Sequence, residues 1–462
     1  MMRQSPNSIS EVTLNSSLKR DWFQVSITLS NDQIRALLKS LSEGVFFDSG
    51  ADCTRGQFDI LSGNPASVER ADKNNNTSNS LTSNLPIYST LFKRTRLNIP
   101  KTYQHLPFIC GIIGFCSYEY GAQKTINQTK LLTESKLPHA FFGHYTWSYV
   151  YDRTNKQGVV TFSPDCLPNK RYEVIKHINS SLKKANTTDK SFEMTNWQKQ
   201  QNFEKYHGSF KRTLDYIKAG DCYQVNLAQR FECDFKGNPT DLYFSQRKNI
   251  NTPYSCFFSF SKDQHILSFS PEQFIGIQAK KVKTSPIKGT AQNSNDKQSA
   301  NNLKNSLKNK AENLMIVDLM RNDLSKVCQL NSIKVNELFK LETFRNVHHL
   351  VSEIEGVLKP EYNEIDAFFS CFPGGSITGA PKKRAMEIIN ELEESGRDAY
   401  CGSVFYWNDD GQFDSNILIR TIVHSEDKLY CWGGGGIVHD SVVEDEYKES
   451  LIKVANLTGI ES

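Results

Sequence analysis

The stretch FFGHYTWSYVYD, residues 141–152, decides the fold class of this 462-residue chain. It is rich in aromatic and β-branched residues, which suit the pleated, half-buried surface of an antiparallel sheet. Three more segments of this kind lie nearby: GQFDIL (56–61), GIIGFCSYEY (111–120) and GVVTFS (158–163). After residue 203, strand-like runs alternate with helical runs to the end of the chain. These patterns predict an α+β protein with antiparallel sheets.

Two polar stretches divide the chain. The segment ADKNNNTSNSLTSN (71–84) is rich in Asn and Ser and predicts an exposed loop. The region 166–202 is polar and loses its periodicity towards its end, which favours a connector. We therefore expect an N-terminal part over 1–165 and a second part over 203–462, packed closely together, with no internal repeat.

Composition excludes several classes of protein. The chain has 55 basic and 51 acidic residues, so it lacks the broad positive charge of a nucleic-acid-binding protein. The N-terminus MMRQSPNSISEV has no apolar core of a signal peptide. The longest apolar run, FICGIIGFC at 108–116, is shorter than the ~20 residues that span a bilayer. The 11 cysteines show no CxxC spacing, which predicts neither zinc nor a disulfide framework and favours a reducing, cytoplasmic compartment.

The segment KTSPIKGTAQ (283–292) places a lysine, Lys288, where a short strand is expected to turn. Glu272 precedes the predicted hairpin FIGIQ–KVKTSPIKG that leads to this lysine, so the two side chains can meet. A buried lysine has a lowered pKa and can act as a nucleophile or base, and a carboxylic acid beside it can act as a general acid. The alternative is a solvated lysine and a turn glutamate. The residues alone leave both possibilities open.

Two helices are predicted with some precision. One covers 203–219 and ends at Gly220, the residue type that commonly follows a helix. The other, AENLMIVDLMRNDL (311–324), is apolar on nearly all sides, so we expect most of it to be buried. Glu312 is expected in its first turn, where the helix dipole favours a carboxylate. It could equally be a metal ligand.

A third helix is predicted from about Ser441. Ser441 and Glu444 have the spacing of a capping box. Glu446, Glu449 and Lys453 follow at helical intervals, so they share one stripe of the surface. Two such carboxylates can hold Mg²⁺, which needs only one or two protein carboxylates and takes its other ligands from water and substrate. An exposed, salt-bridged helix face is the structural alternative.

Two glycine-rich turns and an arginine complete the candidate site. The loop Gly374–Ala380 runs into a helix with Pro381 at its first position, and a helix N-terminus binds anions. Four glycines at 433–436 allow backbone to approach a ligand closely. Arg420, in a strand-like segment, could clamp a carboxylate. Neither turn is a dinucleotide fingerprint or a P-loop. Together these residues predict a site for an anionic ligand with several carboxylates and a divalent cation.

Seven motifs occur in the order found in one enzyme family: PIKGT, ENLMIVDLMRNDL, VHHLVSEIEG, PGGSITGAPK, YCGSVFYW, NILIRT and GGGIVHDSVVEDEYKES. On these motifs the chain resembles the chorismate-utilising enzymes. This family includes the first components of anthranilate synthase and aminodeoxychorismate synthase, isochorismate synthase and salicylate synthase. The resemblance covers nearly all of 203–462 and extends more weakly into the N-terminal part. It implies large antiparallel sheets packed as a central sandwich, with helices outside.

Within this family, the resemblance assigns the two groups of the hairpin. Anthranilate synthases carry alanine in the slot of Lys288, and lysine there is the mark of the aminodeoxychorismate synthases. The implied role of Lys288 is to attack C2 of chorismate while the C4 hydroxyl leaves, after which ammonia attacks C4 and expels the lysine. Glu272 matches the acid that protonates the departing hydroxyl. The product would be 4-amino-4-deoxychorismate, on the route to p-aminobenzoate and folate.

Further roles follow from the same resemblance, residue by residue. The Mg²⁺ ligands would be Glu312, Glu446 and Glu449. The residues around the substrate would be Gln224, His349, Thr378, Tyr400, Arg420, Gly434, Gly435 and Lys453. An amino-acid pocket between the two parts, which holds tryptophan in relatives, would include Ser49, Arg55, Gly56, Gln57, Phe58, Pro253, Tyr254 and Ser255. The chain has FFDSG where many relatives have a leucine-rich LLES.

No segment looks like a glutaminase with a nucleophilic cysteine in a glycine-flanked elbow, so ammonia is expected from a separate glutamine amidotransferase subunit. Anthranilate synthase component I is the alternative enzyme, and Lys288 argues against it. Isochorismate or salicylate synthase is the third possibility. A non-catalytic protein that binds chorismate or tryptophan is the fourth, although binding alone does not need all the acidic residues named above.

Overall fold

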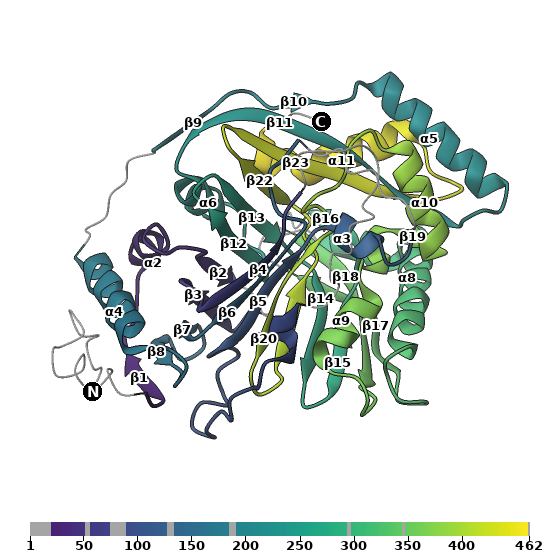
Figure 1. Ribbon diagram of the computed structural model, residues 1–462. Helices are drawn as coiled ribbons and strands as arrows, with labels where there is room; N and C mark the ends of the chain where they lie inside the picture. Colours follow the sequence, from purple (N-terminus) through teal and green to yellow (C-terminus); the bar gives the residue numbers. More distant parts are fainter. Residues whose placement is uncertain are drawn as a thin grey trace.

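The computed structural model describes residues 20–50, 56–73, 89–126, 134–183, 191–292, 297–343 and 347–460. Most of the loop predicted at 71–84 lies outside these residues. Within them the strands form two sheets, of 13 and 10 strands, and neighbouring strands are antiparallel (Figure 1). The predicted α+β class with large antiparallel sheets is confirmed.

The 13-stranded sheet combines strands from both ends of the chain. Its main path has the order β1-β8-β7-β3-β2-β12-β13-β22-β23-β11-β10, and β9 and β19 also pair with β11. Its strands are β1 (Phe23–Ser26), β2 (Val45–Asp48), β3 (Phe58–Ser62), β7 (Trp147–Asp152), β8 (Gln157–Phe162), β9 (Phe192–Met194), β10 (Gln198–Lys199), β11 (Gln224–Gly237), β12 (Tyr254–Ser261), β13 (Gln264–Ser270), β19 (Gly379–Ala380), β22 (Thr421–Ser425) and β23 (Lys428–Ile437).

The 10-stranded sheet is also built from distant segments. Its order is β16-β18-β15-β14-β21-β20-β5-β6-β4, and β17 pairs with β18. Its strands are β4 (Ser67–Ala71), β5 (Gly111–Cys116), β6 (Ala140–Tyr145), β14 (Gln273–Gln278), β15 (Lys281–Thr284), β16 (Ile287–Gln292), β17 (Lys334–Thr343), β18 (Val347–Val357), β20 (Ser403–Asn408) and β21 (Phe413–Asn416).

The alternation of side chains along β12 shows how the two sheets pack. Phe258 and Phe260 point to the 10-stranded sheet, where their rings lie 5.2 Å and 5.4 Å from that of Phe141 on β6. Phe257, which directly precedes Phe258, points to the opposite face, and its ring lies 5.7 Å from that of Tyr243. Because successive residues of a strand face opposite sides, one strand contributes to the core between the sheets and to the core under the helices. The predicted sandwich is confirmed.

The helices lie outside this sandwich (Figure 1). Helices α2, α4, α6 and α11 cover the outer face of the 13-stranded sheet, and their buried apolar side chains form a core with that face. The α-helices are α2 (Asn31–Leu38), α3 (Tyr118–Ala122), α4 (Pro168–Leu182), α5 (Phe203–Lys218), α6 (Pro239–Arg247), α7 (Lys297–Asn305), α8 (Leu307–Ser325), α9 (Glu364–Cys371), α10 (Lys382–Leu392) and α11 (Val443–Thr458), and the 3-10 helices are η1 (Thr90–Lys93) and η2 (Gly375–Ile377).

Both sheets draw strands from 1–165 and from 203–462, so the two parts share one core. The segment 166–202 contains α4, whose buried Val174, Ile175 and Ile178 pack on the outer core, followed by β9 and β10. The division of the chain into three parts therefore stays a prediction, and the middle part is more structured than its polar composition suggested.

Two further findings concern the exclusions drawn from composition. Over the described ranges, no helix is long and apolar enough to cross a membrane. The ten cysteines in those ranges are all buried and none is in a disulfide. The expected lack of a disulfide framework holds for this part of the chain.

Candidate active site

The candidate site lies where the chain crosses from one sheet to the other. Glu272 lies between β13 of the 13-stranded sheet and β14 of the 10-stranded sheet, and Arg420 lies between β21 and β22, which also belong to different sheets. The two crossings are adjacent, because the amide of Ile417 donates to the carbonyl of Glu272 at 3.1 Å. Strand ends that change sheets at one place leave room for side chains between them.

Glu272 is buried, with 5% of its surface exposed. Burial disfavours the carboxylate and raises the pKa of Glu272 to about 6, although a hydrogen bond from Ser376 and the positive charges of Lys288 and Lys453 act in the opposite direction. The hydroxyl of Ser376 donates to its Oε1 at 2.8 Å. A carboxyl group with such a pKa can hold a proton near neutral pH and deliver it.

Lys288 is the second residue of β16, so the expectation that it lies at a turn is wrong. Its side chain is half-buried, and Nζ donates to the carbonyl of Ser376 at 3.2 Å. Desolvation lowers the pKa of Lys288 from its ordinary value, even though Glu272 and Glu312 act to raise it. The solvated turn lysine considered from the sequence is not what the structure shows.

Ser376 joins these two groups. It belongs to η2, in the loop PGGSITGAPK, and it is 5% exposed. Its hydroxyl bonds Glu272 while its carbonyl bonds Lys288, so one residue holds the acid and the amine next to each other. Sequence analysis did not single it out, although it lies in a loop that was already predicted to border the site.

Arg420 adopts a left-handed backbone conformation with φ of 52°. A non-glycine residue in this region is uncommon, and functional sites are one of the places where such backbone strain is kept. The expectation that it lies within a strand is wrong, because it occupies the bend between β21 and β22. Burial lowers the pKa of its guanidinium and the charge of Glu272 raises it. A half-buried cation that acts electrostatically on the carboxyl group of Glu272 suits the binding of an anion.

The stripe predicted on the C-terminal helix faces the glycine run of β23. Nζ of Lys453 lies 2.7 Å from Oε1 of Glu449 and donates to the carbonyl of Gly434 at 2.9 Å. A Cβ at Gly435 would lie 2.9 Å from Oε2 of Glu446 and 3.6 Å from Oε1 of Glu449. The carboxylates therefore reach the strand only because a glycine is there.

The predicted capping box at the start of this helix is wrong. Helix α11 begins at Val443, and no side chain caps its N-terminus. The hydroxyl of Ser441 donates to Oε1 of Glu446 at 2.7 Å instead of pairing with the first turn near Glu444. Ser441 thereby orients a site carboxylate. The spacing of Ser441 and Glu444 matches a capping box, but the hydroxyl of Ser441 binds Glu446 and not the backbone of the first turn.

Glu312 is half-buried on α8 and acts electrostatically on Lys288. Helix α8 begins at Leu307, so Glu312 lies in its second turn and not in the first. The helix is also less buried than predicted, since Leu314 is 51% exposed and Asp318 is exposed. Among the residues that the structure describes, no three His, Cys, Asp or Glu side chains form a ready-made metal site.

Gln224 begins β11 and is fully buried. Its strand pairs with β19, which follows η2, and a Cβ at Gly436 would lie 2.8 Å from its Nε2. Neither atom of its amide group has a hydrogen-bond partner in the described part of the chain. Because buried polar groups nearly always have partners, this amide suits contact with a polar ligand.

The other predicted substrate residues are buried around this centre. Thr378 follows η2, and its hydroxyl donates to the carbonyl of Gly374 at 3.0 Å, so it shapes the loop itself. Tyr400 stacks on Trp432 with ring centroids 6.4 Å apart, and burial raises its pKa well above the ordinary value. His349 lies on β18 opposite Thr290 and is 2% exposed.

The residues predicted to line an amino-acid pocket come from both parts of the chain and partly lie on neighbouring strands. Ser255 on β12 pairs with Asp48 on β2, and the hydroxyl of Ser49 donates to the carbonyl of Phe58 at 2.5 Å. A Cβ at Gly56 would lie 2.3 Å from the carbonyl of Ser49. The structure places Pro253, Tyr254 and Ser255 at the same end of β12, whereas Gln57 is exposed and Arg55 lies outside the described residues.

Asp48, which sequence analysis missed, forms ion pairs with Arg153 at 3.1 Å and with Arg247. Arg153 also contacts Asp59 at 2.7 Å. Burial and the charge of Asp48 raise the pKa of Asp59 to about 7. The network reaches Ser49, whose amide donates to Oδ1 of Asp59 at 2.9 Å. No local pattern marks it, because its members come from four separate elements.

Comparisons with known proteins identify the family of the chain. Residues 43–459 match the family described as chorismate binding enzyme. The chain is 40% identical over 360 residues to aminodeoxychorismate synthase component 1 of Salmonella typhimurium, covering 77% of each chain. It is 33% identical over 368 residues to anthranilate synthase component 1 of Lactococcus lactis, covering 76% of this chain and 79% of that one.

A solved structure extends the likeness to the fold. Anthranilate synthase component I from Streptococcus pneumoniae matches with a TM-score of 0.76 and 27% sequence identity, covering 88% of this chain and 93% of that chain. The residues that match the family, 43–459, include the 10-stranded sheet, every strand of the 13-stranded sheet except β1, and every described residue of the candidate site. The chain therefore belongs to the family of chorismate binding enzymes.

Proposed function

We propose that this chain converts chorismate and ammonia to 4-amino-4-deoxychorismate, with Lys288 as the nucleophile and Glu272 as the general acid. The proposal is supported by the relative named aminodeoxychorismate synthase component 1, which is 40% identical over 77% of the chain. It is also supported by the lysine at position 288, where anthranilate synthases have alanine.

One observation carries the proposal. The reaction needs a neutral amine and a protonated carboxyl group at the same time. Burial raises the pKa of Glu272 to about 6 and lowers the pKa of Lys288, so desolvation moves both groups towards the neutral pair. Ser376 holds them together without an ion pair between them among the described residues. In water the same two groups would be charged and unreactive.

In the first step the lone pair of Lys288 Nζ forms a bond to C2, the two conjugated double bonds of the ring shift by one position towards C4, and the C4–O bond breaks. The departing oxygen takes the proton of Glu272 and leaves as water, which overcomes the poor leaving ability of hydroxide. Ammonia then forms a bond to C4, the bond between Nζ and C2 breaks, and the carboxylate of Glu272 accepts a proton from the new ammonium group.

We propose that a divalent cation binds between the C-terminal helix and the glycine run of β23. Glu446 and Glu449 supply the oxygen ligands that Mg²⁺ prefers, and Gly435 leaves the space beside both carboxylates that a Cβ would fill. We propose that these two residues, with Glu312, hold Mg²⁺. When bound, the ion would neutralise carboxylates of the substrate. Arg420 and Lys453 would orient the same anion from the protein side.

Two partners complete the proposal. The relatives above are named as component 1, and we propose that a separate glutamine amidotransferase supplies ammonia to this chain.

We also propose that a pocket between Ser49 and Ser255 holds tryptophan or a similar amino acid. Calorimetry with tryptophan tests the pocket, and an unchanged heat signal would reject it.

The test of the function is product analysis. The chain alone is incubated with chorismate, Mg²⁺ and ammonium at high pH, and the products are identified by mass. Aminodeoxychorismate is the expected product. Anthranilate with release of pyruvate would assign the alternative activity of the Lactococcus lactis relative, and chorismate binding without turnover would assign a non-catalytic role.

A further inference from the structure

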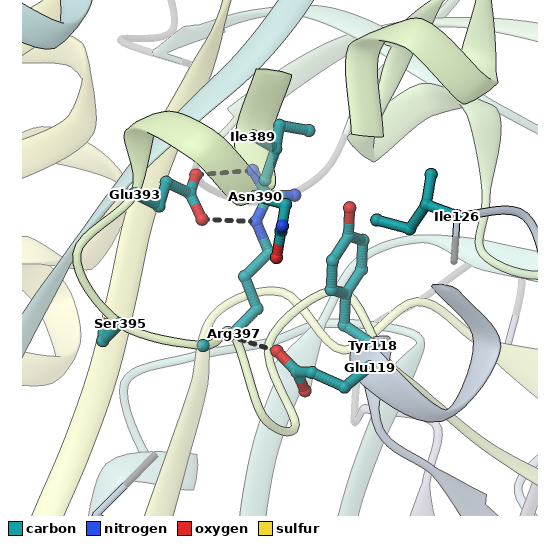
Figure 2. Close-up of a pocket in the computed structure, with 9 residues that line it drawn as sticks. Tyr118, Glu119, Ile126, Ile389, Asn390, Glu393, Ser395 and Arg397 are labelled. Atoms are coloured by element: carbon teal, nitrogen blue, oxygen red, sulfur yellow. Dashed lines mark hydrogen bonds and ion pairs between the residues drawn. The ribbon is translucent and has the colours of Figure 1, made fainter. Parts of the chain in front are cut away.

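Arg397 is a buried cation behind the active site, which the reaction above does not use. It is 1% exposed and forms a bidentate ion pair with Glu393, with Nε and Nη2 lying 2.9 Å and 2.7 Å from the two carboxylate oxygens. Figure 2 shows this pair between the end of α10 and the small pocket that it borders. Its guanidinium also lies 4.9 Å from the ring of Tyr118 and 5.7 Å from that of Tyr400.

The remaining donors of Arg397 reach the backbone of two site segments. Nη1 donates to the carbonyl of Ile377 at 2.9 Å, and Nη2 donates to the carbonyl of Asn226 at 2.7 Å. Ile377 follows Ser376, the residue that holds Lys288 and Glu272, and Asn226 lies two residues after Gln224 on β11. One planar group therefore connects the loop of the acid and amine to the strand that carries the unpartnered amide.

Glu393 extends this connection. Its Oε1 accepts the amide of Ala228 at 2.9 Å in addition to the bond from Arg397, so β11 is held at two points two residues apart. A guanidinium has five donors in a rigid fork, whereas a lysine has one flexible ammonium. Only arginine can bind both carboxylate oxygens and both carbonyls from one plane.

We propose that Arg397 is a positioning residue: by holding Ile377 and Asn226 at a fixed separation, it sets the distance from Lys288 and Glu272 to the substrate side of β11. It touches no reacting atom. The inference rests on the proposed function only in the choice of chorismate as the substrate of the assay. The contacts of Arg397 are the same whichever product is formed.

The test compares Arg397 with Arg171, a second buried arginine. Arg171 is also fully buried and donates to backbone carbonyls, of Cys166 at 2.9 Å and Asp21 at 2.7 Å, but it lies on α4, on the outer face of the 13-stranded sheet. Arg397→Ala, Arg397→Lys and Arg171→Ala are assayed at a temperature at which circular dichroism shows each to be folded. Turnover is followed as consumption of chorismate, so an unexpected product would overturn the proposed function and leave this comparison intact.

We expect kcat to fall about 30-fold in Arg397→Ala with KM for chorismate changed less than about threefold, because orientation is lost while the binding groups remain. Arg171→Ala should keep kcat within about twofold while its unfolding temperature falls. Guanidinium at millimolar concentration should restore part of the kcat of Arg397→Ala through the adjoining pocket, whereas urea should not. If Arg397→Ala does not fold, Arg397→Lys decides, with an expected fall of about tenfold.

A second readout does not depend on chorismate turnover. The rate at which acetic anhydride labels Lys288, measured by peptide mass, should change in Arg397→Lys and stay at the wild-type value in Arg171→Ala. Wild-type kcat and wild-type labelling of Lys288 in folded Arg397→Lys would overturn the proposal. A loss of kcat in Arg397→Ala or Arg397→Lys that only follows the unfolded fraction of the variant would also overturn the proposal and leave Arg397 with a structural role.

Discussion

The site contains two pairs of glutamate and lysine that differ in their surroundings. Lys453 and Glu449 form a direct ion pair at 2.7 Å on α11, and their side chains are 41% and 51% exposed. Glu272 is 5% exposed, and it meets Lys288 through Ser376 without an ion pair within the described residues. The first pair is charged and screened by water, and the second is pushed towards its neutral form.

Two pairs of the same residue types therefore differ in charge state and reactivity because their exposure to solvent differs. Desolvation lowers the pKa of Lys288 and raises that of Glu272, while the solvent around the helix pair stabilises both charges. The half-exposed pair is suited to meeting an ion or an anionic substrate. The pair of Glu272 and Lys288 is suited to forming and breaking bonds, because desolvation moves both groups towards the uncharged acid and amine.

The largest effect is expected when the amine of the buried pair is removed. Lys288→Ala should lower kcat on the order of 10³-fold or more, since the loss of a nucleophile leaves only binding and electrostatic stabilisation. The measurement is formation of aminodeoxychorismate from ammonium. Lys283→Ala is the matched control, because Lys283 lies in the preceding hairpin and pairs with Glu353 at 2.6 Å. Equal rates for wild type and Lys288→Ala would demote Lys288 to a structural residue.

Titration of Glu272 should change the dependence of the reaction rate on pH. Below its pKa of about 6, Glu272 is protonated, and a rise in pH increases the rate through the growing share of neutral Lys288, whose pKa is lowered by desolvation. Above about 6 the loss of the proton from Glu272 offsets that gain, so the rate should flatten. Glu272→Gln should lower kcat by about 10²- to 10⁴-fold. Its remaining rate should keep rising through pH 6, and a retained inflection there would assign it to another group.

Removing the link between the two groups should have an intermediate effect. Ser376→Ala deletes a hydrogen bond that stabilises the carboxylate of Glu272. The pKa of Glu272 should therefore rise above 6, and kcat should fall roughly tenfold, as expected for one bond to a charged group. The profile of rate against pH measures both changes. Ser403→Ala removes a buried hydroxyl bonded to the carbonyl of Asn416 at 2.6 Å and should shift neither.

The proposed metal site at Glu446 and Glu449 should bind a cation more weakly when a methyl group is added beside its carboxylates. Gly435→Ala places a methyl group 2.9 Å from Oε2 of Glu446. We expect Mn²⁺, followed by electron paramagnetic resonance as a substitute for Mg²⁺, to bind about tenfold more weakly. Gly208→Ala is the control, since nothing lies within 4 Å of a Cβ there. Unchanged Mn²⁺ binding in Gly435→Ala would remove this carboxylate pair from the proposed metal site.

Local patterns predicted most of the framework. The aromatic, β-branched runs became β3, β6, β7 and β8, and the helix at 203–219 is α5. The prediction failed over Ser117–Tyr120, which looked like the end of a strand. There the hydroxyl of Ser117 accepts the amide of Tyr120 at 3.2 Å and starts α3. A capping serine outweighed the strand preference of the tyrosines.

The site was predictable in part. Lys288 and Glu272 flank one hairpin, so their approach follows from local structure. The role of Ser376 does not, because 88 residues separate it from Lys288 and only the crossing of the two sheets brings them together. The same holds for Arg397 and Asn226, which are 171 residues apart. Long-range pairing of this kind leaves no periodic signal in a single sequence.

The smallest effect should come from neutralising the exposed pair. Lys453→Met removes an ion pair between side chains that are 41% and 51% exposed. The free energy of unfolding should fall by only about 0.5 kcal/mol, because solvent screens the pair and both side chains lose entropy in forming it. Urea unfolding of the chain without ligands measures this. A loss above about 2 kcal/mol would mean that the pair is coupled as strongly as a buried one. In that case exposure to solvent would not explain why Lys453–Glu449 and Lys288–Glu272 behave differently. The difference would then depend on Ser376, which binds both Lys288 and Glu272.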